Sequence, residues 1–158
     1  MDIHVLTSAA AVVAVLGTAV VYGTDVFCAV VMRPALALVD DGALVAVTGR
    51  VHRFGDRRMP VPGALGIVAT VAALVLAAVA AAWAQVIAAG VALIALLVWI
   101  ALYTQVSAPI NRQLTAAADG GLLLPSGRAL QQKWDRIIGM RAALQGLAVA
   151  ALCVVLVV

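Results

Sequence analysis

The feature that most constrains this chain is a long stretch without charge, which runs from Met59 to Asn111. It is too long for one membrane-spanning helix, which needs about 20 residues, and it is long enough for two. Trp83 and Gln85 interrupt its middle with an indole and an amide, groups that favour the interface between membrane and water. We therefore predict two helices, about 63–83 and 86–103, joined by a tight hairpin without basic residues.

Two further apolar segments complete the pattern, one before and one after this stretch. Hydrophobic residues make up 66% of the chain and charged residues 11%, whereas charged residues are about 25% of a soluble domain. The first segment is too long for a signal peptide and lacks the basic residues that begin one, so we interpret it as a retained helix. The predicted fold is an all-α membrane protein, a single domain of residues 1–158. Its four helices form an antiparallel transmembrane bundle, at about 5–32, 63–83, 86–103 and 137–158.

The two long connecting segments are expected to contain short helical pieces and turns. Proline disfavours helical geometry in the residue before it, so Arg33-Pro34 is expected to end the first helix. Residues 35–47 are apolar enough for a short interfacial helix in the first cytoplasmic loop, and 52–60 are expected to form a compact turn. A polar helical segment that begins at Arg128, after Ser126 as N-cap, is expected to continue into the last helix.

The basic residues are confined to two parts of the chain. All ten follow either the first or the third helix, whereas the hairpin at Trp83 and both ends of the chain have none. By the positive-inside rule both termini are non-cytoplasmic, and the two long connecting segments are cytoplasmic. This topology accounts for the net charge of +3, so we predict no nucleic-acid partner.

Two charged residues lie inside the apolar segments, Asp25 in the first and Arg141 in the last. A guanidinium below the membrane surface costs several kcal/mol unless it is paired or hydrated. At the helical rise of 1.5 Å per residue, both positions lie in the cytoplasmic half of the membrane, so the two side chains are expected to meet. Such a pair serves either as a buried structural ion pair or as part of a functional site.

The histidines and cysteines restrict the choice of chemistry. His4 precedes the first helix and His52 lies in the cytoplasmic segment, so about 30 Å of membrane separates them and no two-histidine metal site is predicted. His52 and Asp56 have the spacing of one helical turn, which leaves a single metal or haem at His52 open. Cys28 and Cys153 lie at different depths, so no disulfide is predicted, and the lack of a Cys-x-x-Cys motif argues against a disulfide-generating quinone oxidoreductase.

Three local patterns resemble those of a known family. They are Asp25-Val-Phe-x4-Met-Arg33-Pro34, Ala108-Pro109-Ile110-Asn111-x2-Leu114 and Trp134-Asp-Arg-x4-Arg141-x2-Leu144. Together they resemble the anthrone oxygenase-like family of small four-helix integral membrane proteins, many of which are uncharacterised bacterial proteins. The resemblance implies a location in a bacterial inner membrane. It also implies oxygenation of a hydrophobic polycyclic aromatic substrate, an anthrone, without a metal or flavin cofactor.

The residues present suit that chemistry. A base that removes the acidic benzylic proton of an anthrone produces an electron-rich enolate, which can react directly with O₂. A cation beside the oxygen would stabilise the developing charge. The candidate catalytic residues are Arg141 as the cation and Asp25 or His52 as the base. The candidate substrate-binding residues are Asn111, Trp134 and Tyr22.

Two other classes of function share these features. A non-catalytic accessory subunit that binds quinone or haem would also use Arg141 and Asn111, with His52 as a ligand. A small proton-coupled transporter would use the carboxylate of Asp25. The expected partners are membrane lipid and a hydrophobic aromatic molecule, and either a homo-oligomer or a larger membrane complex is compatible with the sequence.

Overall fold

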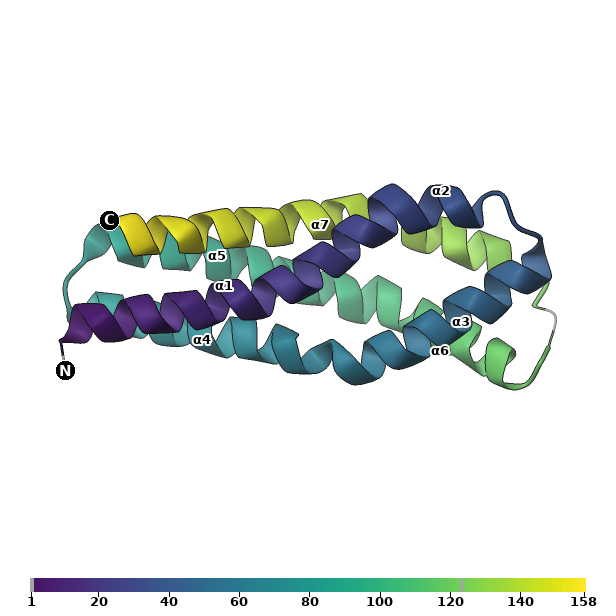
Figure 1. Ribbon diagram of the computed structural model, residues 1–158, viewed down its shortest axis with the longest axis horizontal. Helices are drawn as coiled ribbons and strands as arrows, with labels where there is room; N and C mark the ends of the chain where they lie inside the picture. Colours follow the sequence, from purple (N-terminus) through teal and green to yellow (C-terminus); the bar gives the residue numbers. More distant parts are fainter. Residues whose placement is uncertain (1, 123) are drawn as a thin grey trace. The chain divides into compact units, whose positions relative to one another are not determined.

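The computed structural model describes residues 2–122 and 124–158, and this part of the chain contains helices and no strand. Four continuous helical stretches are long and apolar enough to cross a membrane: Ile3–Leu36, Pro60–Val79, Trp83–Asp119 and Gly127–Val157. The predicted all-α architecture with four spans is thereby confirmed, and it indicates an integral membrane protein. Figure 1 follows the elements in chain order: α1 (Ile3–Phe27), η1 (Cys28–Met32), α2 (Arg33–Leu36), α3 (Asp41–Arg58), α4 (Pro60–Val79), α5 (Trp83–Leu102), η2 (Tyr103–Ser107), α6 (Ala108–Asp119) and α7 (Gly127–Val157).

The hairpin between the second and third spans lies a few residues before its predicted position, so that Trp83 and Gln85 are inside α5 rather than in the turn. Helix α4 ends at Val79 and α5 begins at Trp83. Ala81 adopts a φ of 53°, in the left-handed region that residues other than glycine rarely occupy. This one residue reverses the chain, so the loop stays short.

The first and third spans continue past the positions where we expected them to end. Each contains a π-helical turn just before a proline: η1 precedes Pro34, and η2 precedes Pro109. The backbone N–H of Arg33 donates to the carbonyl of Cys28, five residues earlier, and Ala108 donates to Tyr103 in the same way. Proline in a regular helix clashes with the carbonyl four residues before it, and the wider π-helical turn accommodates the ring. The expected helix end at Arg33-Pro34 is therefore wrong.

Helix α3 also differs from the expectation for the first connecting segment. A short helix over 35–47 and a turn over 52–60 were expected, but one continuous helix runs from Asp41 to Arg58. Its N-terminus is capped by Asp40, whose carboxylate accepts a hydrogen bond of 2.8 Å from the backbone of Ala43. Because α3 includes His52 and Asp56, these two side chains lie on the same face of a helix rather than in a turn.

The chain divides into two compact units. The first consists of Met1–Gly23, Val61–Trp99 and Ala143–Val158, and the second of Thr24–Pro60 and Ile100–Ala142. Each unit has hydrophobic clusters of its own.

The first unit has small residues inside and large ones outside. Several alanines of α1, α4 and α5 are almost fully buried, whereas many valines and isoleucines of the same helices are exposed. A Cβ at Gly17 would lie 2.8 Å from the backbone nitrogen of Gly66 and from the carbonyl oxygen of Pro62, so α1 and α4 are in backbone contact there. Close packing through small residues, with large apolar residues facing outwards, is typical of helices in lipid.

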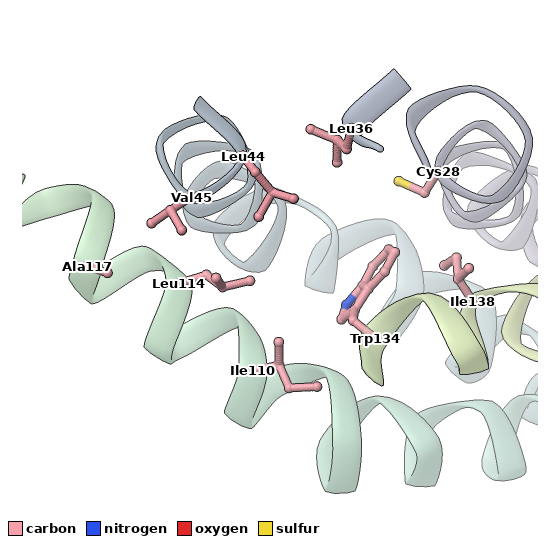
Figure 2. Close-up of a cluster of buried hydrophobic side chains, with 9 residues drawn as sticks. All are labelled: Cys28, Leu36, Leu44, Val45, Ile110, Leu114, Ala117, Trp134 and Ile138. Carbon is pink, nitrogen blue, oxygen red and sulfur yellow. The ribbon is translucent and has the colours of Figure 1, made fainter. Parts of the chain in front are cut away.

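The second unit is built around the pair α3 and α6, which lie side by side (Figure 1). Gly49 of α3 leaves no room for a Cβ against the backbone of Leu114 in α6, and its carbonyl oxygen accepts a hydrogen bond of 3.1 Å from the hydroxyl of Thr115. Figure 2 shows the hydrophobic cluster of this unit, in which the indole of Trp134 lies among apolar side chains, including Leu44 and Ile138. This cluster holds the polar side chains of the candidate site in place.

Candidate functional site

A buried ion pair lies at the centre of the second unit. The guanidinium of Arg141 in α7 is 2.9 Å from the carboxylate of Asp25 in α1 and also donates a hydrogen bond of 2.7 Å to the hydroxyl of Ser107. Only about 5% of each charged side chain is exposed. The predicted meeting of Asp25 and Arg141 is confirmed. The free-energy cost of removing these two charges from water is offset by their attraction to one another.

Aromatic side chains surround the guanidinium. Its central carbon lies 5.5 Å from the ring centroid of Tyr103 and 5.7 Å from that of Trp134, within the range of cation–π attraction. The ring of His52 lies 5.4 Å from the same indole, inclined at 51°. The indole of Trp134 is therefore the common neighbour of a fixed cation and an imidazole.

Asp56 anchors the second half of the site. One oxygen of its carboxylate accepts hydrogen bonds of 2.9 Å from both the hydroxyl of Tyr103 and the side-chain amide of Asn111. Asn111 is buried and lies inside α6, within the third span, rather than at the end of the third helix where the sequence predicted it. Through Tyr103 and Asn111, Asp56 joins α3 to the third span and fixes the position of His52 one turn away.

The imidazole of His52 is neutral at physiological pH. Burial lowers its pKa from the ordinary value of 6.5 to about 4; the positive charge of Arg141 acts in the same direction, whereas Asp56 and the neighbouring Gln131 oppose the change. Its Nε2 atom is buried and has no hydrogen-bond partner among the described residues. A neutral imidazole with an unpartnered nitrogen is chemically competent to accept a proton.

Other buried polar side chains of this unit also have an atom without a hydrogen-bond partner within residues 2–122 and 124–158. Among these atoms are the side-chain oxygens of Asn111 and Gln131 and the indole nitrogen of Trp134. A buried polar atom without a partner costs about 1–3 kcal/mol, so several of them in one cluster favour the binding of a polar molecule there. Both donors and acceptors are present, which suits a ligand with carbonyl and hydroxyl groups.

The structure gathers most of the predicted site residues into one unit, with one exception. Arg141, Asp25, His52, Asn111 and Trp134 all belong to the second unit and are at least 95% buried. Tyr22 belongs to the first unit, where its ring lies beside Gly146. The geometry therefore gives Tyr22 no place in this cluster of the second unit.

Three contributors to the cluster were not predicted as site residues: Tyr103, Ser107 and Gln131. Tyr103, Ser107 and Asn111 recur at intervals of four residues, which places them on one face of a helix. This spacing is present in the sequence, but it was not interpreted as one helical face because the helix was expected to end at Tyr103. Gln131 lies one turn before Trp134 on α7 and carried no signal beyond that spacing.

A cluster of metal-ligating side chains or a pair of cysteines would indicate a different kind of site. No cluster of three or more His, Cys, Asp or Glu side chains suited to a metal ion occurs in the described part of the chain. Cys28 and Cys153 are free thiols in different units. The candidate site therefore consists of an ion pair, an imidazole and the aromatic side chains beside them.

Comparison with known proteins gives no relative from which a function can be transferred. No protein-family model, curated protein or solved structure matches this chain. What the site does must be inferred from its own chemistry.

Proposed function

We propose that this protein is a membrane-embedded oxygenase that acts on a hydrophobic polycyclic aromatic substrate of the anthrone type. The observation that carries the proposal is the shared contact of His52 and Arg141 with Trp134. A neutral base and a fixed cation beside one aromatic surface are what an acidic aromatic ketone requires. The substrate class also agrees with the resemblance in the sequence around Trp134 and Arg141.

His52 is the best candidate for the base. Asp25 is held by Arg141, and Asp56 already accepts two hydrogen bonds on one oxygen. The Nε2 atom of His52 has no partner among the described side chains, and the low pKa keeps the ring unprotonated at neutral pH. In the reactive tautomer the lone pair is on Nε2 and takes the proton from the benzylic carbon.

Arg141 supplies the complementary positive charge. Deprotonation moves electron density from the benzylic carbon to the ketone oxygen of the substrate, and a nearby guanidinium lowers the energy of that anion. Asp25 and Ser107 hold the guanidinium in place, so little reorganisation is needed when the charge develops. Trp134 offers an aromatic surface for the substrate and an unpartnered indole N–H as a donor.

The proposed reaction balances with O₂ as the only oxidant. The enolate reduces O₂ and forms a carbon–oxygen bond at the benzylic carbon, which gives a peroxide anion. The imidazolium of His52 protonates this anion to a hydroperoxide. Removal of the second benzylic proton then breaks the oxygen–oxygen bond, so that hydroxide leaves and becomes water with the released proton. One oxygen atom ends in the quinone and the other in water; carbon is oxidised and O₂ is reduced.

Binding of a quinone without turnover is the second candidate function. The unpartnered indole N–H of Trp134 and the imidazole of His52 could both donate to quinone carbonyls. An accessory subunit of this kind would use the same cluster but would consume no O₂.

Turnover by the purified protein tests the proposal. Oxygen uptake and quinone absorbance would be followed with anthrone as substrate, and the uncatalysed oxidation subtracted. We expect His52→Gln to lower the rate by about 10²-fold or more, as for other general bases, and His4→Gln to leave it unchanged. A wild-type rate equal to the uncatalysed rate would contradict the oxygenase, and tight anthraquinone binding in that case would favour the second candidate.

A further inference from the structure

A cavity of about 310 Å³ lies in the second unit beside the candidate site, and the charged residues of its lining are mainly basic. Three arginines line it, Arg33, Arg128 and Arg136, against a single carboxylate, Asp135. The formal charge of the lining is therefore 3 − 1 = +2. A volume near 300 Å³ is large enough for a small-molecule group.

The walls of this cavity are held by specific contacts. Arg128 donates to the carboxylate of Asp41 at 2.5 Å and to the backbone carbonyl of Val39 at 2.7 Å. Asp135 accepts a hydrogen bond of 2.9 Å from the side-chain amide of Gln131. The two contacts of Arg128 join α7 to the start of α3 and to the segment before it.

Two features of the lining specify the kind of ligand. Gln131 is 97% buried, and its side-chain oxygen has no hydrogen-bond partner among the described residues. That oxygen is an acceptor, so it suits a hydroxyl group on the ligand. Leu36 and Leu44 add an apolar part to the same lining. The ligand should therefore combine a negative charge, a hydroxyl group and an apolar portion.

The position of the arginines in the chain favours a lipid. Arg33 lies near the end of the candidate span Ile3–Leu36, and Arg128 and Arg136 lie in the first part of the span Gly127–Val157. Residues near the ends of spans lie at the depth of lipid headgroups, and basic pockets at that depth bind anionic headgroups.

We propose that this cavity binds the phosphate of an anionic phospholipid whose headgroup carries a hydroxyl group, as phosphatidylglycerol does. Arg33 and Arg136 contact the phosphate, Gln131 accepts the headgroup hydroxyl, and Leu36 and Leu44 contact the apolar part next to the phosphate. This inference does not rest on the proposed oxygenase, although Gln131 belongs both to the cavity lining and to the surroundings of His52.

The test compares two double variants that remove the same charge. Arg33→Gln with Arg136→Gln changes the cavity, and Arg50→Gln with Arg57→Gln changes exposed arginines outside its lining. Each protein is placed in nanodiscs of phosphatidylcholine with a minor fraction of phosphatidylglycerol, and the lipid retained on gentle extraction is measured by native mass spectrometry. At about 1 kcal/mol for each of the two arginines, we expect the cavity variant to retain phosphatidylglycerol roughly 30-fold less than wild type, and the control variant to resemble wild type.

The other outcomes are equally informative. Equal losses in both variants would show a diffuse attraction to surface charge and overturn the proposal, as would no loss in either. Displacement of the lipid by millimolar inorganic phosphate would show that the site recognises phosphate from either source, and lack of displacement would show that it needs the lipid. If the double variant does not fold, Gln132→Glu places a negative charge at an exposed position of the lining and should weaken retention in the same direction.

Discussion

The guanidinium of Arg141 and the carboxylate of Asp25 lie 2.9 Å apart although 116 positions separate them in the chain. The pair therefore forms only when the end of α1 and the first half of α7 pack together within the second unit. Each partner alone would be an uncompensated charge in an apolar environment. Loss of either partner is therefore expected to destabilise the second unit.

The first prediction concerns the removal of one or both partners of this pair. Arg141→Ala should destabilise the protein by about 3–5 kcal/mol, because it leaves the buried carboxylate of Asp25 without its partner. Asp25→Ala combined with Arg141→Ala should restore much of the folded protein, since no buried charge is then left. The measurement is the yield of monodisperse protein and its thermal unfolding in detergent.

The exposed pair Arg53 and Asp119 provides the control. Its side chains are 40% exposed and also 2.9 Å apart, so Arg53→Ala should change stability by less than about 1 kcal/mol. If the double variant at Asp25 and Arg141 folds no better than Arg141→Ala, the interpretation as a mutually compensating pair is wrong. If that double variant folds but shows no oxygen uptake, the pair contributes to function as well as to stability.

The arrangement of spans could be predicted because it depends on simple composition. The absence of charge from Met59 to Asn111 specified two helices and a hairpin, and a charge in each flanking segment specified the pair of Asp25 and Arg141. Both conclusions rest on the high cost of burying polar groups in an apolar medium, which leaves few arrangements open. The cost of burying a polar group depends on the identity of single residues, so the spans and the ion pair can be predicted without knowing how the helices pack.

The helix ends and the rest of the site could not be predicted because they depend on local geometry. Pro34 and Pro109 signal a helix end, but a π-helical turn before each of them lets the helix continue. That continuation brings Ser107 and Asn111 onto the same helical face as Tyr103. Because the third helix was predicted to end at Tyr103, Tyr103 and Ser107 were not predicted as residues of the site.

A second prediction concerns the contact of α1 with α4 in the first unit. Gly17→Ala would place a Cβ 2.8 Å from backbone atoms of α4, which cannot move as a flexible side chain can, so we expect a loss of about 1–3 kcal/mol. Gly90 in α5 has open space around the corresponding position. Gly90→Ala should therefore be neutral or stabilise the helix by about 0.5–1 kcal/mol. Equal effects on the unfolding temperature would argue against the close contact.

A third prediction concerns orientation in the membrane. Since all ten basic residues lie either from Arg33 to Arg58 or from Arg112 to Arg141, tags fused to the two ends of the chain should both be reached from the non-cytoplasmic side. A cysteine introduced at the exposed position Gln113 should be labelled only after the membrane is made permeable. Labelling of either terminal tag from the cytoplasmic side alone would contradict this topology.

The last prediction concerns the pH dependence that His52 gives to stability. Its pKa is about 4 in the folded protein, below the ordinary value of 6.5 that applies when the chain is unfolded. Between these two values the unfolded protein binds a proton that the folded protein does not, so stability falls as the pH is lowered through this range and is fully present above it. At about pH 5 the loss should be on the order of 2 kcal/mol relative to neutral pH.

Thermal unfolding of wild type, His52→Gln and His4→Gln at neutral pH and at about pH 5 checks this value. Glutamine cannot take up a proton, so the His52→Gln variant should lose less stability on acidification than wild type, whatever its stability at neutral pH. The His4→Gln variant should follow wild type, because His4 lies outside the buried cluster of the second unit. Parallel losses in wild type and His52→Gln would mean that another group titrates, and the neutral imidazole required of a base at this site would then lose its support.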